Sequence, residues 1–147
     1  MRRPVAFVTA IVLFVEAVGI VLVNGVLATV AGNQSMSLAG MDPDAMVTGT
    51  WVMGGVSGAL LVLCGLVPLL AAIRDRAPGR FGRITLIACA VVHGVLGALA
   101  VGLIGWAAFA FLMAVLALIV LTLVTFDRRE PETRAEGPGV EGTPAPV

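Results

Sequence analysis

Four long apolar stretches, separated by short polar segments, dominate the pattern of residues along the chain. They cover about residues 5–31, 47–73, 84–103 and 106–126. A helix needs about 20 apolar residues to cross the hydrocarbon core of a bilayer, and every stretch reaches that length. The pattern therefore predicts an all-α integral membrane protein with a four-helix transmembrane bundle over residues 1–126.

The last part of the chain has a different character. Residues 127–147 are rich in Glu, Pro and Gly. A segment of this composition cannot bury enough apolar surface to fold by itself. We therefore expect a disordered tail over residues 127–147.

The positions of the arginines predict how the bundle is oriented. All nine basic residues are Arg, and they precede the first stretch, separate the second from the third, or follow the fourth: Arg2, Arg3, Arg74, Arg76, Arg80, Arg83, Arg128, Arg129 and Arg134. The segment between the first two stretches has none. Because cytoplasmic loops carry the excess of basic residues, both termini and the residue 74–83 loop are expected in the cytoplasm.

The absence of Lys, together with many Ala, Val, Gly and Pro residues, is typical of a GC-rich bacterial genome, so we expect a multi-pass protein of the bacterial plasma (inner) membrane. A cleavable signal peptide is the alternative for the first stretch, with Ala31 at the cleavage site. The apolar run is about twice the length of a signal peptide's apolar region, which favours a membrane span.

Composition excludes several classes of function. Only 12% of the residues are charged, a single His and no Tyr are present, and both cysteines, Cys64 and Cys89, lie in apolar stretches. The chain has no phosphate-binding glycine loop, HExxH, CxxC or Ser/His/Asp set. We expect no enzymatic activity, no cofactor, no metal site and no binding of nucleic acid. Asp42 and Asp44 flank Pro43 and indicate a helix start rather than a metal ligand pair.

Two ionisable residues, Glu16 and His93, fall deep inside apolar stretches. At 1.5 Å of rise per residue, Glu16 lies about 20 Å beyond Arg3 and His93 about 15 Å beyond Arg83. Both therefore belong to one layer near the middle of the bilayer, where a contact between them is allowed. Ionisable residues at this depth are costly and are candidates for function.

Glu16 has three interpretations: a proton-binding carboxylate of a transporter, a hydrogen-bonded link between helices, or a contact with a partner subunit. His93 is more often a hydrogen-bonded interhelical residue than a ligand. Asn24 lies nearer the outside, on a broad polar face shared with Glu16, and is a further candidate for lining a polar path.

Small residues form two stripes that favour close helix packing. Gly54 and Gly58 make a GxxxG pattern that Gly65 extends, and Gly94 and Gly97 lie on the third stretch. Such stripes let helix backbones approach closely in membranes. We expect them to pack inside the bundle, with formation of a homo-oligomer as the alternative.

One short segment resembles a known family. The run of Val15, Glu16, Ala17, Val18 and Gly19 is similar to the first-helix neighbourhood of small multidrug-resistance efflux proteins. The resemblance covers about one span. The other three stretches lack that family's aromatic-rich pattern, and the chain is not assigned to it.

The sequence thus favours a small non-enzymatic membrane protein, in contact with membrane lipid, that is an accessory or interaction subunit of a larger membrane assembly. The alternative is a small proton-coupled transporter or channel that uses Glu16 and His93. The two differ in whether water reaches Glu16.

The orientation predicts a labelling pattern. In a chain without Cys64 and Cys89, a Ser37→Cys variant should react with a membrane-impermeant thiol reagent added outside intact cells. A Gly79→Cys variant should react only after the cells are made permeable, because its loop lies in the cytoplasm. The reverse pattern would contradict the orientation.

Overall fold

The computed structural model describes residues 2–34, 40 and 42–127 and is all-helical over this part. The helices are α1 (Arg2–Gln34), α2 (Pro43–Arg74), α3 (Arg80–Leu103) and α4 (Trp106–Asp127). Each is long and apolar enough to cross a membrane, which confirms the prediction of four candidate spans. The predicted tail lies outside the described residues, except for Asp127, the last residue of α4.

The helices begin and end at residues suited to those positions. The Asp42 carboxylate accepts a hydrogen bond of 2.8 Å from the backbone N–H of Asp44, and Pro43 takes the first position of α2, as predicted. The link from α3 to α4 is tight because Gly105 adopts a φ of +116° and donates its N–H to the Ala100 carbonyl at 2.8 Å. Glycine is required there, since other L-residues rarely adopt that conformation.

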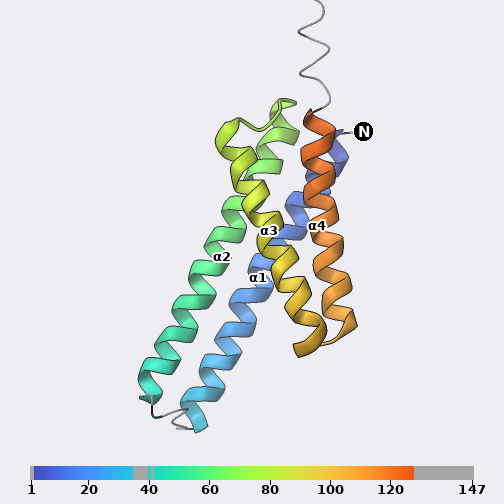
Figure 1. The fold of residues 1–147 in the computed structure, drawn as a ribbon. Coiled ribbons are helices and arrows are strands. Elements are labelled where there is room, and N and C mark those ends of the chain that lie inside the picture. Colours follow the sequence, from blue (N-terminus) through green and yellow to red (C-terminus); the bar gives the residue numbers. More distant parts are fainter. Residues whose placement is uncertain (1, 35–39, 41, 128–147) are drawn as a thin grey trace, which may run out of the picture.

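The bundle consists of two helix pairs that meet mainly at one end. α1 packs along α2 and α3 packs along α4, whereas contact between the two pairs is sparser. At the end that carries the α2–α3 loop, Ala6, Ala71, Ala72 and Phe126 form a small buried cluster. Figure 1 shows the pairs diverging from that end, and α1 and α2 extend further from it than α3 and α4 do.

A buried hydroxyl pair also joins α1 to α4. The Thr9 and Thr122 hydroxyl oxygens lie 2.9 Å apart, and both residues have no exposed surface. Each hydroxyl also lies 2.9 Å or less from the carbonyl oxygen four residues earlier in its own helix. This arrangement pairs both buried hydroxyl groups where α1 crosses α4, as helices in a lipid bilayer require.

The predicted glycine stripes lie at contacts between helices of the same chain. Gly54, Gly58 and Gly65 face α1, where an added Cβ would meet atoms of Asn24, Val21 and Leu13 or Phe14. Gly94 and Gly97 face Leu116 and Met113 of α4. The stripes therefore let α1 approach α2, and α3 approach α4, with little separation between the backbones.

Two adjacent glycines provide a test of this packing. A Cβ added at Gly54 would lie 2.5 Å from the Cβ of Asn24, whereas one added at Gly55 would have no neighbour within 4 Å. Gly54→Ala should lower the free energy of unfolding by about 1–3 kcal/mol, because the α1–α2 contact must open. Gly55→Ala should leave it unchanged or slightly raised.

The measurement is unfolding by sodium dodecyl sulfate in mixed micelles, followed by circular dichroism. Equal stability of the Gly54→Ala and Gly55→Ala variants would show that α1 and α2 do not approach closely at Gly54.

Candidate functional site: the Glu16–His93 pair and its cavity

Glu16 of α1 and His93 of α3 meet in the middle of the bundle. The Oε2 atom of Glu16 lies 3.0 Å from Nε2 of His93. Their side chains are 15% and 3% exposed, respectively. The backbones of α1 and α3 make little contact, so this hydrogen bond is a direct side-chain link between them, beside the buried cluster of Leu13, Leu86 and Ile119 that also joins the two helix pairs.

The partners of His93 limit where its protons can be. Its Nδ1 atom lies 2.8 Å from the carbonyl oxygen of Cys89, one helical turn earlier, and the Cys89 sulfur lies 3.6 Å from the same nitrogen. A carbonyl oxygen only accepts, so Nδ1 carries a hydrogen and donates it. One further proton is then shared by Nε2 and Oε2. The pair has no net charge, whether that proton resides on the imidazole or on the carboxyl group.

The pair borders a cavity of about 510 Å³ between α1, α2 and α3. Its walls are mostly apolar side chains, including Leu60, Leu61 and Leu96, and Ser57, Cys64 and Thr85 add a few polar atoms. This volume and lining fall in the range of small-molecule sites in proteins.

One oxygen of Glu16 is still available for a hydrogen bond. Among the described residues only Oε2 has a partner, and every enclosed polar side-chain atom there is hydrogen-bonded. Oε1 must therefore be accessible, and Glu16 lines the cavity.

Asn24, the third polar candidate, lies apart from this pair. It follows Glu16 by eight residues on α1, packs its Cβ against Gly54 and donates its side-chain amide to the Ile20 carbonyl at 2.9 Å. It does not belong to the lining of the cavity. The broad polar face predicted for α1 is thus divided: Glu16 faces α3, and Asn24 faces α2.

Two contributors to the polar interior were missed as candidates by the sequence analysis. Cys89 supplies the carbonyl that orients His93. Cys89 precedes His93 by four residues, one helical turn, and this spacing could have indicated the contact. Thr122 pairs with Thr9 across 113 residues of sequence, and no local pattern indicates that contact. Within the described residues, no group of three or more His, Cys, Asp or Glu side chains is placed to hold a metal ion.

Comparisons of the chain with protein-family models, with curated proteins and with solved structures give no match. The interpretation of this site therefore rests on its own geometry.

The Glu16–His93 link can be measured with a double-mutant cycle. Glu16→Leu and His93→Leu should each lower the free energy of unfolding by about 1–3 kcal/mol, because each leaves a buried partner without its hydrogen bond. The double variant should lose less than the sum, with a coupling of about 1–2 kcal/mol.

Detergent unfolding followed by tryptophan fluorescence supplies the four free energies. Thr29→Val is the control, since its hydroxyl bonds only the Gly25 carbonyl of its own helix, and its effect should be within about 0.5 kcal/mol. Strict additivity of the two leucine substitutions would contradict an energetic link between α1 and α3.

Proposed function

We propose that this chain is a small non-enzymatic, multi-pass protein of the bacterial plasma membrane that acts as an interaction subunit of a larger membrane assembly. The end with the α2–α3 loop and both termini faces the cytoplasm. The partner is an apolar transmembrane helix that packs on the part of α1 beyond the reach of α3 and α4.

The proposal rests on an exposed continuation of the face that carries Glu16. Val23 and Leu27 follow Glu16 by seven and eleven residues, which places them within about 20° of it around α1. Glu16 is covered by α3, but Val23 and Leu27 are 56% and 54% exposed. A complete four-helix cross-section would cover these side chains.

The unequal lengths of the helices explain the exposure. α1 and α2 have 33 and 32 residues, whereas α3 and α4 have 24 and 22. At 1.5 Å per residue the first pair is about 12–17 Å longer than the second. The apolar part of α1 exceeds the bilayer core by about 10 Å, and such an excess favours tilting or association with other helices.

The polar groups support an interaction role over conduction. The nearest hydrogen-bonded polar side chains on α1 are Thr9 and Asn24, seven and eight residues from Glu16, and each bonds a carbonyl of its own helix. These spacings correspond to about 10–12 Å, too far for direct proton transfer. In the described part of the chain, no relay of hydrogen-bonded side chains leads from Glu16 to either end.

Proton-coupled transport is the second candidate, and the cavity is the observation that favours it. Glu16 lines the cavity and has an accessible oxygen, so a ligand or water could exchange the proton that the pair holds.

Site-specific crosslinking tests the interaction role. A photoreactive residue placed at Leu27 should give one discrete protein adduct in native membranes at normal expression. The same residue at Val18, which is 60% exposed on the opposite side of α1, should give lipid adducts only. An adduct with the mass of two copies would identify the partner as a second copy of this chain.

The contrary outcome is also measurable. Equal adducts at Leu27 and Val18, or none with protein at Leu27, would contradict the interaction surface. In proteoliposomes with an internal pH dye, the wild-type chain and Glu16→Gln should show the same proton leak. A flux that only the wild type supports would establish the transporter instead.

A further inference from the structure

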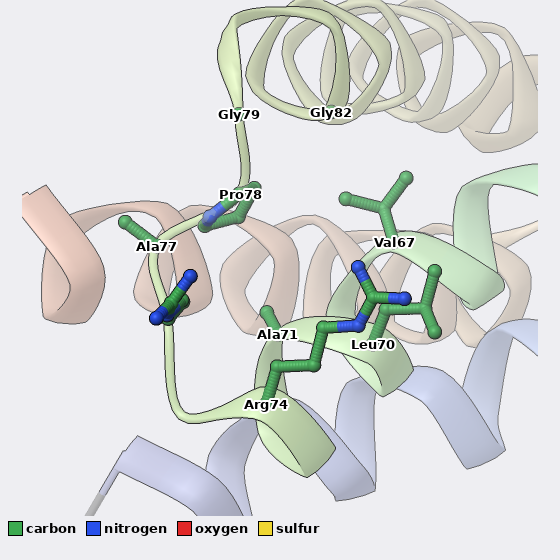
Figure 2. A pocket seen from close by; sticks show the side chains of 9 residues that line it. Val67, Leu70, Ala71, Arg74, Ala77, Pro78, Gly79 and Gly82 are labelled. Atoms are coloured by element: carbon green, nitrogen blue, oxygen red, sulfur yellow. The ribbon is translucent and has the colours of Figure 1, made fainter.

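A second cavity, separate from the Glu16–His93 pair, lies under the loop that joins α2 to α3. Its volume is about 300 Å³, and the last turns of α2, the loop and the first turn of α3 form its walls. Gly82 of α3 packs directly against α2, since a Cβ added at Gly82 would lie 2.9 Å from the side chain of Val67. Figure 2 shows Val67, Leu70 and Ala71 on one side of this space and the Pro78–Gly79 segment on the other.

The charge of this cavity is positive. Arg74 and Arg76 line it, and none of the acidic residues that the structure describes does. The residue between them, Asp75, adopts a φ of 51° and turns the chain, and its carboxylate lies 3.0 Å from the Arg3 guanidinium. Within the described residues neither Arg74 nor Arg76 has an ion-pair partner. Two guanidinium groups beside one cavity suit a phosphate group, which accepts hydrogen bonds from their planar forks.

The surroundings of the arginines are apolar. The Arg74 side chain in Figure 2 lies along Leu70 and Val67 rather than away from the bundle. Ile73 and Phe81, beside the loop, are 60% and 87% exposed. Such exposure is costly in water but not at the boundary between the head groups and the acyl chains of a bilayer. A ligand that reaches this cavity therefore has both an anionic group and apolar chains.

We propose that the α2–α3 loop forms a binding site for the phosphate group of an acidic phospholipid of the cytoplasmic leaflet. Arg74 and Arg76 bind the phosphate, and the acyl chains descend over Leu70 and Val67. Basic pockets at the cytoplasmic ends of membrane helices bind lipid head groups by this combination of charge and apolar contact. The site depends on the membrane orientation but not on a protein partner.

Native mass spectrometry of the full chain, released from detergent with added lipid, tests the site. The wild type should retain one dioleoyl phosphatidylglycerol, with at least about fivefold preference over dioleoyl phosphatidylcholine, which corresponds to about 1 kcal/mol. The preference should disappear in the Arg74→Gln/Arg76→Gln variant. Arg80→Gln, which removes one charge from a residue outside the lining, should retain it.

Three outcomes would overturn the proposal. The first is equal lipid retention by the wild type and the double variant. The second concerns the single variants Arg80→Gln and Arg74→Gln, which each remove one charge. If both lose the preference for phosphatidylglycerol equally, the lipid is attracted by positive charge in general. The third is displacement of the lipid by inorganic phosphate or glycerol phosphate, which would assign the site to a free phosphate. Circular dichroism of each variant checks that the helices remain intact, and the crosslinking result at Leu27 does not bear on this experiment.

Discussion

The requirement that buried polar groups be paired inside the protein, which is strictest for helices that lie in a lipid bilayer, governs this structure. Helices meet it for the backbone. The threonines meet it by bonding carbonyls of their own helices, as Thr50 does with Met46 at 2.8 Å. Glu16 and His93 cannot be satisfied in that way alone, so α1 and α3 must approach until the two side chains meet. Their hydrogen bond therefore fixes one point at which α1 and α3 lie together.

The two helix pairs are held together by different means at different depths. Near the arginine-bearing end, small residues and Phe126 pack closely, and Thr9 pairs with Thr122. Nearer the middle of the bundle, a buried apolar cluster joins α1, α3 and α4 through Leu13, Leu86 and Ile119, and the Glu16–His93 hydrogen bond lies about one turn of α1 further along. Beyond it the pairs diverge and α3 and α4 end, which leaves a cavity beside the pair and an exposed stretch of α1. The same geometry thus supplies both the candidate site and the surface proposed for a partner.

The two proposed sites lie at different depths in the bundle and differ in charge. The Glu16–His93 pair has no net charge, and its surroundings are mostly apolar with a few polar atoms. At the α2–α3 loop, Arg74 and Arg76 have no ion-pair partner among the described residues, lie beside apolar side chains and suit an anionic head group. An exposed ion pair between Arg3 and Asp75 connects the start of α1, the helix that carries Glu16, with the end of α2.

The sequence by itself determined the four helices, the approximate bounds of each, the helix start at Asp42–Pro43, and the common depth of Glu16 and His93. These features follow from composition, rise per residue and local turn chemistry. Only the tertiary structure decided that Glu16 faces α3 while Asn24 faces α2, that Thr122 pairs with Thr9, and that the helix pairs diverge to form a cavity. The physical reason is that a uniformly apolar helix gives no signal for which side its neighbours cover: in lipid, an exposed leucine and a buried one are equally acceptable, so contacts are selected by the shapes of small residues and by a few polar pairs distant in the sequence.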